Sequence, residues 1–151
     1  MAGNRRNRLD PAAQVGAGFP ILLKLGRAGT LAASASVAND AFVVPQSFEK
    51  ASMGGGQALT LTELTMFLGA TGTTSGTTTI VVRKNAVQIG TLSIAFNAAN
   101  LYATLDLRDS QQNGVKCFKG DIIDLLVTAI PGVASSDLSV HIAGEGYGVN
   151  G

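Results

Sequence analysis

The fold is decided by residues Phe118–Ile142, FKGDIIDLLVTAIPGVASSDLSVHI. Two runs in this stretch place apolar side chains at every second position, which is the period of a β-strand. The members are Ile123, Leu125, Val127 and Ala129 in the first run and Leu138, Val140 and Ile142 in the second. The tripeptide at 119–121 predicts a turn before the first run, and Pro131 predicts its end, because proline cannot donate to a strand ladder. The stretch therefore indicates a β-sheet protein.

The same alternation recurs along the chain and predicts an all-β domain. The predicted strands are 21–25, 31–37, 42–44, 59–68, 80–83, 87–96 and 101–108. Glycines at 26–29 predict a turn between the first two, and residues 84–86 predict a hairpin turn. The apolar phase switches inside 59–68 and at Gly90, which is typical of a β-bulge. About eight short strands at this spacing are the pattern of a sandwich or barrel.

The chain divides by composition into an arm, a body and a tail. Residues 1–18 are polar and then rich in Gly and Ala, so we expect an extended basic arm. Residues 19–143 carry the strand pattern and form the predicted sandwich, in which 46–57 is a long irregular connection. Residues 144–151 are rich in glycine and predict a C-terminal tail. Residues 1–30 hold five basic residues against one acidic residue, whereas the remainder is mildly acidic.

Composition narrows the class of protein. Hydrophobic residues make up 46% of the 151 residues and charged residues only 14%, which suits a packed domain better than a disordered chain. Apolar runs stay below the roughly 18 residues of a membrane span. The first residues lack an apolar signal-peptide core, and a single cysteine excludes an intrachain disulfide framework. We expect synthesis in a reducing cytoplasm, without a cofactor.

His141 and Cys117 are the residues most suited to catalysis by type. His141 alternates with Val140 and Ile142, so it is predicted to point outward, away from partners for a triad or a metal site. Cys117 would need a neighbouring base to become a nucleophile, and its place beside Phe118 at a strand start favours a buried structural thiol. We expect no catalytic residue and no metal ligand at either position.

Two pairs of acidic residues also invite a chemical interpretation. Asp121 with Asp124, and Asp106 with Asp109, could form carboxylate pairs of the glycosidase kind. The dense oxygen-ligand pattern of a calcium loop is absent from the sequence. We expect Asp121 to accept backbone N–H bonds in its turn and Asp124 to point outward. The Gly54–Gly56 run lacks the lysine of a phosphate-binding loop, so a flexible connection is the expectation.

The basic cluster formed by Arg5, Arg6 and Arg8 is the predicted partner-binding element. Three interpretations stay open. The cluster could contact nucleic-acid phosphates, although no aromatic residue lies within it to stack on bases. It could dock on an acidic protein surface, or it could be a solvated tail without a partner.

Two segments resemble small jelly-roll proteins of tailed bacteriophages. They are TTTIVVRKNAVQIGTLSI (Thr77–Ile94), with a lysine-asparagine hairpin, and KGDIIDLLVTAIPGVASSDLSV (Lys119–Val140), with a Gly-Asp turn before a strand. Such modules occur in capsid cement or decoration proteins and in head or tail fibre tips. The Gly-Asp feature also occurs in cellular jelly rolls of the tumour-necrosis-factor and complement type. The resemblance covers under half of the chain and does not include the arm.

The resemblance implies a virion structural protein with a single-domain jelly-roll sandwich. We expect it to bind the outside of the capsid and to cement neighbouring major coat subunits, as a homo-oligomer, dimer or trimer. A fibre or receptor-binding tip is the first alternative, and a small coat protein whose basic arm contacts the genome is the second. Neither an enzyme, nor direct contact with nucleic acid, nor a membrane is expected under the leading interpretation.

Overall fold

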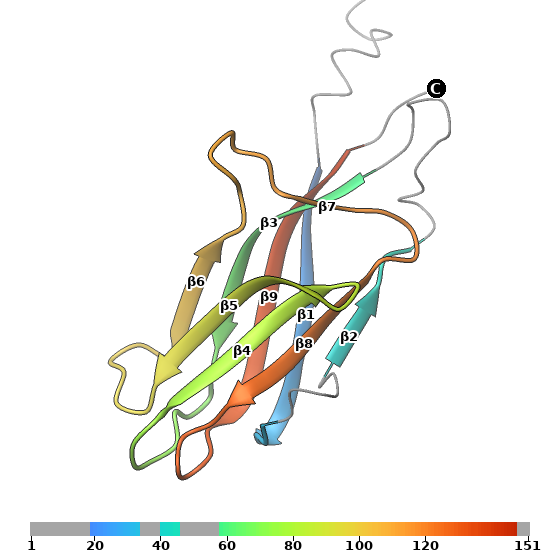
Figure 1. Ribbon diagram of the computed structural model, residues 1–151. Coiled ribbons are helices and arrows are strands. Elements are labelled where there is room, and N and C mark those ends of the chain that lie inside the picture. The colour runs from blue at the N-terminus through green and yellow to red at the C-terminus, as the bar shows by residue number, and fades with distance from the viewer. Residues whose placement is uncertain (1–18, 34–39, 46–57, 148–151) are drawn as a thin grey trace, which may run out of the picture.

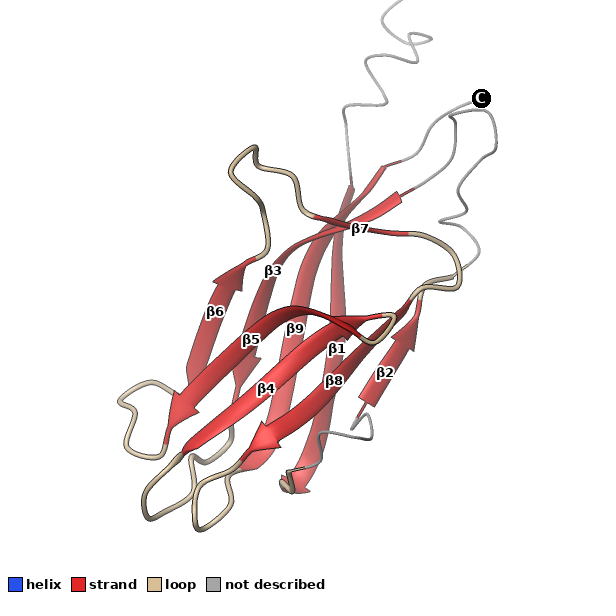
Figure 2. Ribbon diagram, viewed as in Figure 1, coloured by secondary structure: helices blue, strands red, loops and turns tan. Residues whose placement is uncertain are grey.

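The computed structural model describes residues 19–33, 40–45 and 58–147, and these form an antiparallel β-sandwich (Figure 1). The strands are β1 (Phe19–Thr30), β2 (Asp40–Val43), β3 (Ala58–Phe67), β4 (Thr77–Lys84), β5 (Val87–Ala95), β6 (Tyr102–Asp106), β7 (Val115–Cys117), β8 (Ile122–Ala129) and β9 (Ser136–Tyr147). Figure 2 shows that strands and loops make up the whole described chain. The predicted all-β class is confirmed.

The strands are arranged in two sheets that lie face to face. Sheet A is five-stranded, with the order β1-β9-β3-β6 and with β7 also paired to β3. Sheet B is four-stranded, with the order β2-β8-β4-β5. Since β6 pairs with residues 63–67 of β3 and β7 with residues 59–61, the two short strands together occupy one strand position beside β3. Four positions in each sheet, in this crossed-over order, are the arrangement of a jelly roll.

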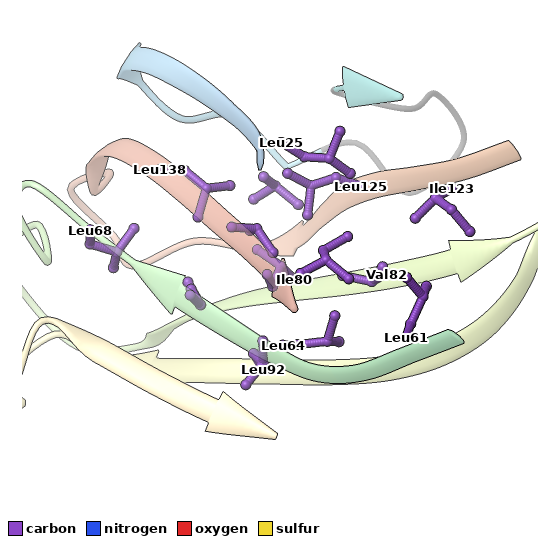
Figure 3. Close-up of a cluster of buried hydrophobic side chains, with 14 of the residues drawn as sticks. Leu25, Leu61, Leu64, Leu68, Ile80, Val82, Leu92, Ile123, Leu125 and Leu138 are labelled. Carbon is purple, nitrogen blue, oxygen red and sulfur yellow. The ribbon is translucent and has the colours of Figure 1, made fainter. Parts of the chain in front are cut away.

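The core lies between the sheets and is built by the alternation seen in the sequence. Figure 3 shows leucine, isoleucine and valine side chains from both sheets meeting in this layer. Ile123, Leu125 and Val127 of β8 are fully buried, as are Val140 and Ile142 of β9. Each such side chain contributes about 2 kcal/mol by leaving water. The stretch Phe118–Ile142 thus contributes a central strand to each sheet.

The predicted bulges and hairpin are confirmed. The register of β3 against β9 shifts between Leu61 and Glu63, where the apolar phase switches. The register of β4 against β5 shifts opposite Gly90. At the hairpin, Asn85 and Ala86 both have positive φ, 49° and 66°, which is the geometry of a type I′ turn.

Two boundaries differ from the sequence prediction. The predicted turn at 26–29 is wrong, because β1 continues through it: Gly26 pairs with Ser139, and the register shifts between Arg27 and Thr30. These glycines make an irregularity within one strand, and residues 31–33 are not strand. At the other end β9 runs to Tyr147, past residue 143, because it stays paired with β3 there. Gly144 permits this close pairing, since a Cβ on it would strike the Thr60 carbonyl.

Several predictions concern residues outside the described part of the chain. They are the arm at 1–18 with its three arginines, residues 34–37 of the predicted second strand, the connection at 46–57, and the tail from residue 148.

Candidate interaction surface

Cys117 is a buried residue of β7 and lies in the core cluster. Burial in apolar surroundings raises the pKa of its thiol to about 11, and the charge of Asp121 adds to this while the Lys84 ammonium opposes it. A thiol with such a pKa is protonated at neutral pH, so it lacks the thiolate that nucleophilic attack requires. The structure places Cys117 as predicted, in a packing role.

Asp121 ties the turn before β8 to the β4–β5 hairpin. Its carboxylate accepts hydrogen bonds from the backbone N–H of Phe118 at 2.9 Å and from the side-chain amide of Asn85 at 2.8 Å, and the Lys84 ammonium lies 3.5 Å away. Partial burial opposes ionisation, but these three donors outweigh it and lower the pKa of Asp121. The predicted backbone bond is present, and it belongs to a larger cross-strand network.

Asp106 and Asp109 serve the turn after β6. Asp106 forms two bonds with the guanidinium of Arg108, which hold its pKa down at about 2. Asp109 accepts the backbone N–H groups of Asn113 and Gln111, which lower its pKa. Each carboxylate therefore has a local structural partner.

Neither acidic pair converges on a common site. Asp121 faces its turn network, whereas Asp124 is bonded to Arg83 on the outer side of β8. Residues 19–33, 40–45 and 58–147 contain no group of three potential metal ligands. Over the same ranges there is no helix with the length and apolar character needed to cross a membrane.

An aromatic cluster lies on the outer face of sheet A. His141 points outward, as predicted, and its ring centroid is 4.9 Å from that of Phe67. Phe67 in turn lies 6.4 Å from Tyr102 on β6. We refer to Phe67, Tyr102 and His141 as the aromatic cluster. Charged side chains, including Lys24, Glu63 and Asp106, share this face with it.

The outer surface of sheet B, which we call the sheet B face, has a different chemistry. The side chains on this side belong to Ala41, Val43, Thr79, Val81, Arg83, Gln88, Thr91, Ser93, Ile122, Asp124 and Leu126, of which Asp124 and Leu126 are buried within the chain. Most are small or β-branched, and Val43 and Ile122 are 58% and 44% exposed. The two charged members of the set carry opposite charges, so the face has no net charge.

Polar side chains on the sheet B face are bonded to one another. Arg83 and Asp124 form an ion pair through two hydrogen bonds. The hydroxyls of Thr79 and Ser93 lie 3.0 Å apart, and the Gln88 amide donates to the Thr91 hydroxyl at 2.8 Å. Desolvating a polar group is costly only where it loses partners, so this face can be covered by another protein with a small penalty.

The sequence alone does not reveal the sheet B face, whereas its basic cluster predicts the arm as the partner-binding element. The outward positions of 77–94 read as plain alternation, and the pairing of Arg83 with Asp124 depends on β4 and β8 being neighbours. A signal was present nonetheless. Between residues 77 and 95 most outward positions hold threonine, serine or valine, and charge is confined to the hairpin end.

No family model and no curated protein matches the chain. Solved structures match at the level of fold. The core of Drosophila NLP, described in terms of pentamer formation and histone binding, shares 12% identity over 84% of this chain and 97% of its own, with a TM-score of 0.40. The globular domain of zebrafish complement 1qA shares 13% identity over 85% of this chain and 97% of its own, with a TM-score of 0.38.

A viral protein is also among the matches. The Tobacco streak virus coat protein shares 12% identity over 82% of this chain and 85% of its own, with a TM-score of 0.28. These likenesses extend to the sandwich fold alone.

Proposed function

We propose that this protein is a structural component of a virion, which binds the outside of the capsid and cements neighbouring coat subunits. The observation that carries the proposal is the sheet B face. Its exposed apolar residues Val43 and Ile122 offer area for burial, and its polar side chains already have partners. A surface of this kind suits a long-lived contact with another protein better than contact with a soluble substrate.

Two further features support this function. The jelly-roll order of the strands agrees with the resemblance of residues 77–140 to phage decoration modules. The basic arm at 1–18 would add a second contact, reaching an acidic surface of an adjacent subunit. Several weak contacts on a symmetric lattice combine into firm attachment without one dominant site.

The test is co-sedimentation with shells assembled from a major coat protein. Val43→Glu places a charge in the sheet B face and is expected to reduce shell occupancy at least tenfold. Leu22→Glu is the matched control, because Leu22 is equally exposed, at 55%, on the outer face of sheet A. An equal loss of shell occupancy in both variants, or no loss in either, would contradict docking through sheet B.

Deleting residues 2–18 tests the arm separately. Reduced occupancy on shells would assign docking energy to Arg5, Arg6 and Arg8, and unchanged occupancy would remove the arm from the proposal. Salt-dependent retention of the intact protein on DNA, lost with the deletion, would favour the coat-protein alternative.

The aromatic cluster favours a second candidate function, that of a receptor-binding tip. Aromatic rings beside polar groups such as Lys24 and His141 can bind the apolar face of a sugar ring. Binding of the isolated protein to host-cell glycans, abolished by Tyr102→Ala and retained by Leu22→Ala, would support this candidate. Intact binding by Tyr102→Ala would exclude the cluster from it.

A further inference from the structure

Edge strands are where a β-sandwich can pair with another chain, because one side of each edge strand has backbone groups outside the ladder. Sheet A ends at β1 and at the position shared by β6 and β7, and sheet B ends at β2 and β5. Figure 1 shows β2 and β5 as the two outer strands of the front sheet. The four edges differ in how well they are protected.

Three of the edges carry features that oppose pairing. Strand β1 contains Pro20 and the exposed Lys24, and the carboxylate of Asp40 binds its Gly26 N–H at 2.8 Å. Strand β2 has four residues, and β6 has five and ends at the charged Asp106. Charge, proline and short length are the usual means of protecting an edge.

Strand β5 has none of these protections. Its nine residues, VQIGTLSIA, include neither a charged residue nor a proline, and valine, isoleucine and threonine favour strand structure. Among the described strands β5 pairs with β4 alone. Beyond the register shift at Gly90, the stretch Thr91–Ala95 pairs regularly, and Thr91, Ser93 and Ala95 are exposed.

The backbone of β5 presents these three residues to the free edge. The Phe96 N–H donates to the Gly76 carbonyl at 3.1 Å, which fixes the even-numbered positions as those bonded to β4. Directions alternate along an antiparallel strand, so the N–H and C=O groups of Thr91, Ser93 and Ala95 point away from β4. Among these groups, the Ala95 carbonyl already accepts the Ala98 N–H at 3.1 Å in the turn that follows β5. Side chains fill the space between β5 and β6, because Leu105 of β6 and two other leucines pack against Gly90 of β5.

We propose that β5 pairs in antiparallel fashion with β5 of a second copy of this chain, about a two-fold axis at Ser93. Ser93 then lies opposite Ser93 of the second copy, and Thr91 lies opposite Ala95 of the second copy. The pairing forms about four backbone hydrogen bonds, because the Ala95 carbonyl of each copy keeps its bond to Ala98. A second copy is the fitting occupant because the strand is uncharged and its outward side chains are small, so it meets itself without repulsion or steric conflict.

Pairing at this edge joins the two copies of sheet B into one continuous sheet and brings their sheet B faces side by side. In the capsid role proposed above, one dimer would then contact two coat subunits. That consequence depends on the proposed function, whereas the dimer itself does not and can be measured on the free protein.

Sedimentation velocity across a concentration series tests the pairing. The wild-type chain is expected to form a dimer, and Ser93→Lys is expected to raise the dimer dissociation constant about tenfold or more, because two ammonium groups meet at the axis. Thr104→Lys is the matched control, since Thr104 is an exposed residue of the β6 edge and its variant should dimerise normally. Circular dichroism of each variant establishes that the sandwich is folded.

Charge rescue makes the test specific for the two-fold axis. Ser93→Lys mixed with Ser93→Glu should form a heterodimer, and amide exchange at Ser93 and Ala95 should slow as the protein concentration rises. A monomeric wild-type protein, a trimer or larger ring, full dimerisation of folded Ser93→Lys, or a mixture without heterodimer would each overturn the proposal. Failure of shell binding with an intact dimer would overturn the capsid role alone.

Discussion

Arg83 on β4 and Asp124 on β8 lie opposite each other and are joined by two hydrogen bonds, with Arg83 Nε 2.7 Å from Asp124 Oδ1. The geometry is that of a bidentate guanidinium–carboxylate pair, which is stronger and more directional than a single contact. Hydrogen bonding to Asp124 raises the pKa of Arg83, although desolvation opposes this. The pair explains how a sheet face with two full charges can still be neutral and preorganised.

We expect Arg83→Met to destabilise the protein, because Asp124 is a buried residue and would lose its partner. The double variant Arg83→Met with Asp124→Leu should recover most of the lost stability, since no charge is then left behind. Urea unfolding of the three proteins measures this. A double variant less stable than Arg83→Met would contradict the assignment of the loss to a stranded carboxylate.

Much of the fold could be predicted because a half-buried strand has apolar residues at alternate positions, where the side chains face the core. The phase switches at 61–64 and at Gly90 even located the bulges, since one extra residue moves every later side chain to the other face. The burial of Cys117 and the backbone hydrogen bond to Asp121 could also be predicted, from a neighbouring aromatic residue and from a turn motif.

Other features could not be predicted because their causes are long-range. Gly26 looked like a turn residue, but a Cβ there would lie 2.5 Å from the carbonyl oxygen of Leu138, so glycine permits close approach of β9. Asn85 and Ala86 predict a hairpin turn. The local sequence does not indicate that the Asn85 side chain also forms hydrogen bonds with Asp121 and Ile122, which lie far along the chain. The sheet B face required knowledge of which strands are neighbours.

The hairpin turn contains a correctable strain at Ala86, whose φ is 66°. A residue with a Cβ pays about 1 kcal/mol in the left-handed region, whereas glycine does not. We expect Ala86→Gly to raise the free energy of unfolding by about 0.5 kcal/mol, after the entropy cost of glycine is deducted. Ala41→Gly, in an exposed part of β2, is the control and should lower it; a loss of stability in both would refute the turn argument.

Two buried glycines should tolerate a methyl group to different degrees. A Cβ at Gly144 would lie 2.6 Å from the Thr60 carbonyl oxygen, which is backbone, whereas at Gly90 it would meet the methyl ends of Leu64 and Leu105. Leucine ends can rotate and a paired strand cannot. We expect Gly144→Ala to cost about 3 kcal/mol and Gly90→Ala about 1 kcal/mol, measured by denaturant unfolding. The reverse order would show that the β5–β6 side of the core is the more rigid.

Cys117 should behave as an indicator of unfolding. Its burial and its raised pKa, about 11, predict very slow reaction with a thiol reagent at about pH 8 in the native protein. Reaction should become fast in denaturant, and its midpoint should coincide with loss of the β-sheet circular dichroism signal. Rapid labelling of the native protein would mean that β7 opens independently of the sandwich.

Acid sensitivity should arise in part from Asp121. Its pKa is lowered in the folded protein, so the unfolded chain, with a carboxyl pKa of about 3.9, takes up the proton first as the pH falls. The stability that its bonds to Asn85 and Phe118 provide is therefore present above about pH 4 and is lost as the pH drops through the lower, folded value. Asp121→Asn should be less stable than wild type at neutral pH and should lose less stability on acidification. Urea midpoints between about pH 7 and pH 2.5 measure both effects. Parallel curves of midpoint against pH for the two proteins would show that the acid transition arises from other carboxylates. Asp106 and Asp109, whose pKa values are also lowered, would then be the first to substitute.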